Sequence, residues 1–321
     1  MDLPDLGFGG APVAGLFDPV GEAAASQTLQ AALDAGLRYF DTAPYYGFGL
    51  SERRIGDAVR GKEGIVLSTK VGRLLKPGLP DDAAGLGWPK PLPFHPVFDY
   101  GYDGVMRSYE DSLQRLGLDR VDILYLHDID AYTHGDPSEE ARHFNDAVTG
   151  GYRALEELRR SDDVSAIGIG VNEVDVCLRV LEHGDWDIFL LAGRYTLLEQ
   201  DALDPLLERC KVQEVKVVVG GPFNSGILAG GATWNYAEAP ASVRDRAARL
   251  RDICEAHSVP LPAAALQFPL AHPVVECVIP GTRTPGELRE VMDWKDTDIP
   301  AELWTDLKSE GLLNPVAPIP D

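Results

Sequence analysis

The alternation of short apolar runs with longer amphipathic segments constrains this chain more than any other feature. Each apolar run has the length and the β-branched content of a strand, and each amphipathic segment has the spacing of a helix. Strands are predicted over residues 37–40, 65–68, 121–126, 164–169, 188–191, 215–219 and 274–279, with an eighth near residues 12–16. Such an alternation is typical of a parallel α/β sheet.

The segments between the strands indicate how the sheet is built. Helices are predicted over residues 22–35, 102–116, 152–160, 174–182, 203–211 and 243–256. Several strands are nearly all apolar, as expected when a barrel interior and a helix layer bury both faces, so eight units favour a closed (β/α)₈ TIM barrel. An open dinucleotide-binding sheet needs GxGxxG directly after a strand, and neither Gly7-Phe8-Gly9-Gly10 nor Gly168-Ile169-Gly170 completes that spacing. We therefore predict one barrel domain over residues 1–321.

A long loop is predicted over residues 76–100, after the third strand, where Pro and Gly are frequent. On a barrel this loop lies at the carboxyl-terminal face, where substrates bind, and its aromatic side chains can form flat apolar walls. Trp88 and Phe94 in this loop, together with Phe17, are candidate substrate contacts. The alternative for each of them is ordinary loop packing.

Charge and cysteine usage exclude several classes of partner. The chain has 51 acidic and 29 basic residues, a net charge of −22 that would repel nucleic acids and anionic membranes. The four cysteines lie far apart without a CxxC pair, so neither a metal site nor a disulfide framework is predicted. No apolar run reaches the roughly 18 residues of a membrane span, and a signal-peptide pattern is lacking. We expect a cytoplasmic protein, either monomeric or homo-oligomeric.

Three ionisable side chains stand where predicted strands end, namely Asp41, Lys70 and His127. These ends converge at the mouth of a barrel, and Tyr46, five residues after Asp41, can turn back over the same mouth. A Lys beside a Tyr hydroxyl stabilises the phenolate and lowers its pKa from about 10 toward neutrality, with Asp41 pairing the Lys. Taken singly, these residues are more often caps or solvated groups. Their combination indicates a catalytic site.

The sequence around these residues resembles that of aldo-keto reductases. The signature segment Phe40-Asp41-Thr42-Ala43-Pro44-Tyr45-Tyr46-Gly47 continues with Ser51-Glu52 and Ile55-Gly56, and Ser68-Thr69-Lys70 and Leu126-His127 also match. The resemblance covers nearly the whole chain. It implies that Tyr46 is the proton donor or acceptor, that Lys70 and Asp41 tune it, and that His127 orients the substrate oxygen. It further implies a nicotinamide cofactor and no metal.

The same resemblance implies a set of cofactor-binding residues. Asn172 would hold the nicotinamide carboxamide, and Phe223 would stack in place of the usual Tyr. The rest of the set lies in two segments, after the seventh and the eighth strand: Ser225, Gly226, Leu228, Gly281, Thr282, Arg283, Glu287 and Glu290. Glu290 corresponds to the residue that binds the adenine.

The second segment bears on the choice between NAD and NADP. Glu287 stands where the family usually has an Arg that grips the 2′-phosphate of NADP. A carboxylate repels a phosphate, so NAD is the expected cofactor, while Arg283 leaves NADP open as the alternative.

Four segments, residues 126–130, 168–173, 191–196 and 220–228, resemble one branch more narrowly, that of L-fucose dehydrogenase and D-threo-aldose 1-dehydrogenase. This implies oxidation of the anomeric hydroxyl of an aldose of the L-fucose, L-galactose or D-arabinose type to a lactone. The alternatives are a pyridoxal 4-dehydrogenase, a general aldehyde reductase, and an aldolase with Lys70 as Schiff-base nucleophile. A cofactor-binding regulatory subunit is the non-enzymatic alternative.

Overall fold

The computed structural model describes residues 2–320 and contains a central sheet of eight parallel strands. In sheet order these are β1 (Phe8–Gly9), β2 (Tyr39–Asp41), β3 (Val66–Val71), β6 (Ile123–His127), β7 (Ala166–Val171), β8 (Ile188–Ala192), β9 (Lys216–Gly220) and β12 (Val275–Ile279). Strand order follows chain order, as in a barrel built from successive βα units.

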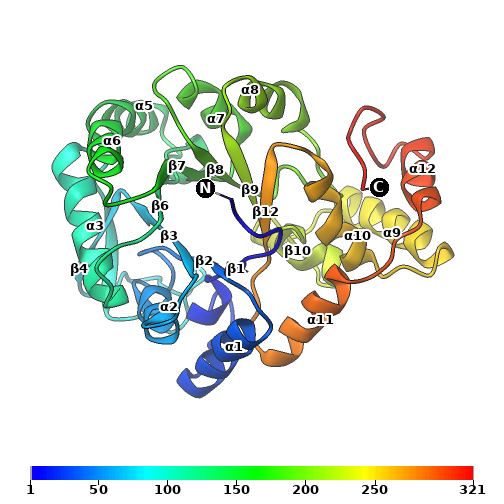
Figure 1. Ribbon diagram of the computed structural model, residues 1–321, viewed down its shortest axis with the longest axis horizontal. Helices are drawn as coiled ribbons and strands as arrows, with labels where there is room; N and C mark the ends of the chain where they lie inside the picture. Colours follow the sequence, from blue (N-terminus) through cyan, green and yellow to red (C-terminus); the bar gives the residue numbers. More distant parts are fainter. Residues whose placement is uncertain (1, 321) are drawn as a thin grey trace.

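The sheet closes between β1 and β12. The N–H of Gly7 donates to Val278 O at 3.0 Å, Gly9 N–H donates to Pro280 O at 2.9 Å, and Val278 N–H donates to Asp5 O at 2.8 Å. The prediction of a (β/α)₈ barrel is therefore confirmed, and Figure 1 shows the strands at the centre with the helices around them.

The prediction of a strand near residues 12–16 is wrong. Residues Pro12–Ala14 form the 3₁₀ helix η1, and the first strand, β1, precedes it. Glycine is needed beside β1, because a Cβ on Gly10 would lie 2.5 Å from the carbonyl oxygen of Asp41. A two-residue strand flanked by glycines has almost no strand signal of its own. Its pairing with β2 and β12 makes it a strand.

The helices pack outside the barrel: α1 (Glu22–Asp34), α2 (Leu50–Val59), α3 (Tyr102–Leu116), α4 (Ala131–His134), α5 (Pro137–Asp146), α6 (Tyr152–Arg160), α7 (Val174–Val180), α8 (Glu208–Val212), α9 (Ala241–Ala256), α10 (Leu261–Gln267), α11 (Pro285–Lys295) and α12 (Ala301–Ser309). Short turns η2 (Ala147–Gly151), η3 (Leu203–Leu207), η4 (Asn224–Ala229) and η5 (Phe268–Ala271) join several of them. The predicted helix 203–211 is divided between η3 and α8.

The segment predicted as a long loop contains a β-hairpin. Strands β4 (Arg73–Pro77) and β5 (Phe94–Phe98) pair antiparallel, with Leu75 opposite Pro96. Proline cannot donate a ladder hydrogen bond and is confined to edges, so Pro96 conceals the strand in the sequence. A second small hairpin, β10 (Thr233–Trp234) and β11 (Ala237–Glu238), follows η4.

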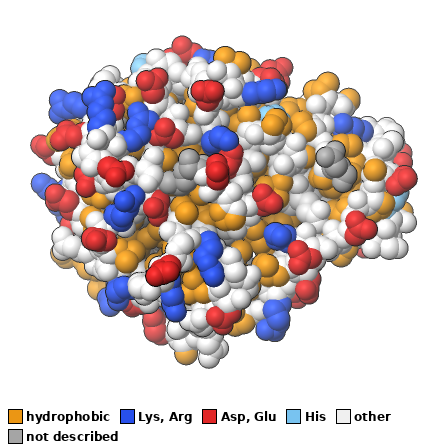
Figure 2. Space-filling view, viewed as in Figure 1, with side chains coloured by type: hydrophobic (Ala, Val, Ile, Leu, Met, Phe, Trp, Pro, Cys, Tyr) orange, Lys and Arg blue, Asp and Glu red, His pale blue; other side chains and the backbone are white. Residues whose placement is uncertain are grey.

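Each barrel strand is buried on both faces. Along β6, Ile123 and Tyr125 belong to the cluster inside the barrel, whereas Leu124 and Leu126 belong to the larger apolar cluster under the helices. On the face seen in Figure 2, acidic and basic side chains are interspersed. Within residues 2–320, the helices are all too short or too polar to cross a bilayer.

Candidate active site

The three predicted strand-end residues meet at the carboxyl-terminal mouth of the barrel. Lys70 Nζ on β3 donates to Asp41 Oδ1 at 2.9 Å, to Asp41 Oδ2 at 2.7 Å and to Thr42 O at 2.9 Å. The side chains of Lys70 and Asp41 are only 1% and 2% exposed. The ammonium group is thus held by three acceptors in a buried ion pair.

Asp41 is buried among donors. Besides Lys70, its Oδ1 accepts a hydrogen bond from Ser68 Oγ at 2.7 Å. Burial raises the pKa of the Asp41 carboxyl, and the charge of Lys70 and these hydrogen bonds oppose the rise. The pair is consequently a costly arrangement that the surrounding barrel keeps in place.

Tyr46 lies next to this pair, with Lys70 Nζ 4.8 Å from the centre of its ring. Burial raises the pKa of Tyr46 well above its usual value, Asp41 and Asp128 add to the rise, and Arg73 opposes it. The predicted fall of this pKa toward neutrality is therefore not found in the protein alone, because burial outweighs the nearby cations.

His127 is buried beside Tyr46, and the two ring centres lie 5.9 Å apart. Burial lowers the pKa of His127 well below its usual value, and the cations Arg73 and Lys70 lower it further. The imidazole is thus neutral and can donate one hydrogen bond and accept one. Its Nε2 lies 3.3 Å from Asp128 Oδ2.

A cleft of about 440 Å³ runs from Asp41 and Tyr46 to the start of α11. Most of the predicted cofactor residues line it: Phe223, Ser225, Gly226, Gly281, Thr282, Arg283, Glu287 and Glu290. Phe17, predicted to contact substrate, lines it as well. Residues after β1, β2, β9 and β12 thus share one cleft.

One polar group in this cleft is available to a ligand. The hydroxyl of Thr282 is buried without a partner and lines the cleft. The neighbouring Gly281 shapes the wall: a Cβ there would lie 2.5 Å from Pro12 Cγ, so glycine lets the segment after β12 pack against η1.

Arg283 is already paired within the protein. Its Nη1 donates to Asp18 Oδ2 at 2.7 Å, and its Nε lies 3.6 Å from Glu287 Oε1. The Arg283 backbone N–H also donates to Glu287 Oε2 at 2.6 Å. The guanidinium of Arg283, predicted as a possible partner of a 2′-phosphate, is therefore already bound by two carboxylates.

Four residues predicted to bind cofactor or substrate lie outside the lining of this cleft: Leu228, Asn172, Trp88 and Phe94. Leu228 is fully buried, and its N–H donates to Phe223 O at 3.2 Å. Asn172 donates from Nδ2 to Asp128 Oδ1 at 3.2 Å and accepts from Tyr236 Oη at 3.3 Å. Trp88 and Phe94 belong to an apolar cluster beside Tyr46. The roles proposed for all four stay predictions.

Sequence reasoning missed Arg73, Asp128 and Tyr236. Asp128 directly follows His127, a polar residue at a strand end, and that signal could have drawn attention to it. Tyr236 lies at the tip of the β10–β11 hairpin, and its ring faces that of Phe17 across the cleft at 6.3 Å. Only folding brings this hairpin over the mouth.

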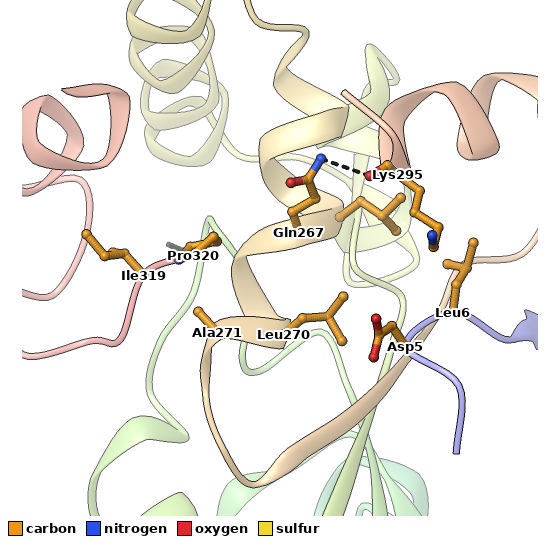
Figure 3. Close-up of a pocket in the computed structure, with 9 residues that line it drawn as sticks. Asp5, Leu6, Gln267, Leu270, Ala271, Lys295, Ile319 and Pro320 are labelled. Carbon is orange, nitrogen blue, oxygen red and sulfur yellow. Dashed lines mark hydrogen bonds between the residues drawn. The ribbon is translucent and has the colours of Figure 1, made fainter. Parts of the chain in front are cut away.

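A second cavity lies by the segment before β1, η5 and the carboxyl-terminal residues (Figure 3). Asp5, Leu270 and Lys295 are among its lining residues, and Gln267 Nε2 donates beside it to Lys295 O at 3.2 Å. Because residues before β1 and β12 line it, this cavity is away from the carboxyl ends of the strands. It is distinct from the candidate active site.

The sequence matches one family model and is similar to enzymes of known activity. The model of the Aldo/keto reductase family matches residues 5–310. The chain is 46% identical to a pyridoxal 4-dehydrogenase of Microbacterium luteolum, over 98% of this chain and 96% of the relative. It is 39% identical to a D-threo-aldose 1-dehydrogenase of a Pseudomonas species, over 98% and 95% of the two chains.

Solved structures have the same fold. An aldo-keto reductase from Bacillus halodurans in its holo form superposes with a TM-score of 0.72 at 25% identity, over 99% of this chain and 94% of that one. The glycerol dehydrogenase from Gluconobacter oxydans gives a TM-score of 0.73 at 20% identity, over 99% and 94%, which concerns the fold alone.

Proposed function

Because the chain belongs to the aldo/keto reductase family of NAD(P)-dependent oxidoreductases, we propose that it oxidises the hydroxyl of a cyclic hemiacetal to a lactone. The observation that carries this proposal is that Tyr46, Lys70 and His127 lie together at one end of a cleft. Most of the residues predicted to bind the cofactor line the rest of that cleft. Asp41 completes the catalytic set.

An aldose of the L-fucose, L-galactose or D-arabinose type presents such a hydroxyl at its anomeric carbon. Free pyridoxal presents one in its internal hemiacetal, and the higher identity to a pyridoxal 4-dehydrogenase favours it as the second candidate. Both substrates require the same chemistry, loss of a proton from oxygen and of a hydride from the carbon that bears it.

A nicotinamide cofactor held by cleft residues such as Phe223, Thr282 and Glu290 would supply the hydride acceptor. Oxidation requires Tyr46 to act as a phenolate that accepts the proton of the substrate oxygen, and Lys70, fixed by its three acceptors 4.8 Å from the ring centre, is the cation that would favour this form once substrate and cofactor are bound. Neutral His127 orients the substrate oxygen through a hydrogen bond. The barrel holds these groups on rigid strand ends, so little reorganisation is needed when charge develops.

We further propose NAD as the preferred cofactor. Asp18 and Glu287 both form ion pairs with the guanidinium of Arg283. Their carboxylates would repel the 2′-phosphate of NADP. The ribose hydroxyls of NAD carry no such charge.

All four cysteines are buried free thiols, which accords with the cytoplasmic location predicted from the sequence.

The Schiff-base alternative is disfavoured by the surroundings of Lys70. Such a nucleophile needs an unprotonated amine in apolar surroundings, whereas Lys70 is ion-paired with Asp41. Borohydride treatment with substrate is expected to leave Lys70 unlabelled.

The test is absorbance at the reduced-nicotinamide band, with NAD or NADP and a panel of pyridoxal, L-fucose, L-galactose, D-arabinose and D-glucose. Reduction with pyridoxal or with one of the first three aldoses is expected, faster with NAD. A second panel offers simple aldehydes with NADH or NADPH and follows the loss of the same band, and turnover there without any in the first panel would contradict the proposal and favour a general aldehyde reductase. Cofactor binding without any turnover would contradict the proposal and favour a regulatory subunit.

A further inference from the structure

Three buried polar atoms without a partner in the protein gather around the ring of Tyr45. They are Arg73 Nε, Trp88 Nε1 and His127 Nδ1. The guanidinium carbon of Arg73 lies 4.2 Å from the centre of the Tyr45 ring, and the ring centres of Trp88 and His127 lie 5.7 and 6.2 Å from it. Buried polar groups are nearly always hydrogen-bonded, so these three leave hydrogen bonds to be made with a polar ligand or with ordered water.

A buried ion pair adjoins this cluster. Arg73 Nη2 donates to Asp128 Oδ2, and the two side chains are 5% and 12% exposed. Asp128 also accepts from Asn172 and lies against His127 Nε2. Its φ of +49° is in the left-handed region, which costs a non-glycine residue on the order of 1 kcal/mol and is enriched at active sites.

Asp128 is close to the proton-transfer groups as well as to the cleft. It follows His127 directly, and its charge helps to raise the pKa of Tyr46. On its other side, Asn172 connects it to Tyr236, which lines the cleft. A substrate oxygen held by Tyr46 and His127 would therefore have the Asp128 carboxylate as its neighbour.

We propose that Asp128, held in place by Arg73, determines specificity by accepting a hydrogen bond from a substrate hydroxyl near the reacting carbon. The inference rests on the proposed function. A carboxylate only accepts, and the unpaired Arg73 Nε–H only donates, so together they match the donor and acceptor of a hydroxyl group. The charge of Arg73 is balanced by Asp128, which suits a neutral hydroxylated substrate.

The experiment compares two substrates that differ by one hydroxyl, in wild type and in Asp128→Asn. D-Arabinose and 2-deoxy-D-ribose differ only at the 2-hydroxyl. If pyridoxal is the substrate, its counterpart is the analogue that lacks only the ring 3-hydroxyl and keeps the hydroxymethyl group that closes the hemiacetal. The matched control is Asp122→Asn, at the opposite end of the same strand β6, where the carboxylate accepts only from the Leu67 N–H within hydrogen-bonding distance.

Wild type is expected to prefer the hydroxylated substrate by about 100-fold in kcat/KM, because a site built around a hydroxyl rejects its absence. Asp128→Asn should reduce that preference to about tenfold or less, mainly by raising KM for the hydroxylated substrate. Asp128 also acts on Tyr46 and His127, so a change common to both substrates is expected as well, and it cancels in the ratio of the two kcat/KM values. Asp122→Asn should leave the preference intact.

An equal loss with both substrates, or an unaltered preference, would overturn the inference. If Asp128→Asn fails to fold, Arg73→Lys keeps the ion pair while removing the Nε donor, and it should lower the same preference. Failure of the proposed function is recognisable without any variant, because wild type would then oxidise neither an aldose nor pyridoxal.

Discussion

Two ion pairs at the mouth of the barrel have the same N–O distance but differ in burial and in the segments that they join. Lys70–Asp41 and Arg283–Asp18 both measure 2.7 Å. The first joins β3 to β2 with side chains 1% and 2% exposed, whereas the second joins two loop segments with side chains 40% and 74% exposed. Burial and backbone rigidity, rather than distance, separate their roles.

The energetic consequences follow from that difference. Removing one partner of a buried pair leaves an uncompensated charge and costs about 3–5 kcal/mol, while an exposed pair contributes about 0–1 kcal/mol. Lys70–Asp41 is therefore a fixed part of the proposed catalytic site. Arg283–Asp18 can open and re-form around a cofactor at little cost to the fold, so we expect it to influence cofactor choice.

The largest effect is expected where the buried pair meets the reacting group. Tyr46→Phe removes the proton-transfer hydroxyl and should lower kcat by about 10³-fold, within the range typical of a general acid or base. Cofactor binding, measured by fluorescence titration, should be retained. Near-normal turnover in this variant would refute the mechanism.

Lys70→Met tests the buried pair itself. Turnover should fall by about 100-fold or more, and the free energy of unfolding by about 3–5 kcal/mol, because Asp41 is left without its cation. The double variant Lys70→Met with Asp41→Asn should recover much of the stability, measured by denaturant unfolding, without recovering turnover. Equal recovery of both would mean that the pair is only structural.

A pH profile tests the ion pair between Arg73 and Asp128. Burial raises the pKa of Asp128 to about 6, against the opposing charge of Arg73. Below that pH the carboxyl is protonated and no longer a pure acceptor, so KM for a hydroxylated substrate should rise about tenfold per pH unit. Asp128→Asn should lack this limb. An identical limb in that variant would assign it to another group.

The same shift has a consequence for stability. Because the folded-state pKa of Asp128 exceeds its ordinary value of 3.8, the folded protein binds the proton more tightly than the unfolded chain. Its contribution to the free energy of unfolding should therefore decrease as pH rises from about 4 to 6, and level off above pH 6. Comparing denaturant midpoints of wild type and Asp128→Asn across this range isolates it.

Glu287→Arg tests the exposed pair through cofactor choice. Replacing the carboxylate with a guanidinium should raise the ratio of NADP to NAD utilisation by about tenfold or more, because the 2′-phosphate then meets cations. Steady-state kinetics with both cofactors measures the ratio. An unaltered ratio would mean that the adenosine end of the cofactor lies elsewhere in the cleft.

The smallest effect is expected from Asp18→Asn, which frees Arg283 from one carboxylate. NADP utilisation should rise by about threefold or less, and the free energy of unfolding should change by less than about 1 kcal/mol. A stability loss comparable to that of Lys70→Met would remove the distinction between the two pairs.

Much of this arrangement was predictable because it depends on patterns within short segments. The apolar runs from residues 37 to 279 predict seven barrel strands, since each has a strand's length and β-branched content. Parallel strands bring their carboxyl ends to one mouth, so the meeting of Asp41, Lys70 and His127 follows from their positions at strand ends. β1 escaped prediction because its identity depends on its partners.

The sequence by itself determined the barrel, the members of the catalytic set and the carboxylate Glu287 in the cofactor segment. Only the tertiary structure decided their electrostatics, because a pKa depends on burial and on charges from distant segments. Burial and the charges of Asp41 and Asp128 raise the pKa of Tyr46, and Arg73 lies beside Asp128 because β3, which precedes Arg73, pairs with β6. Contacts between segments so far apart leave no local pattern in the chain.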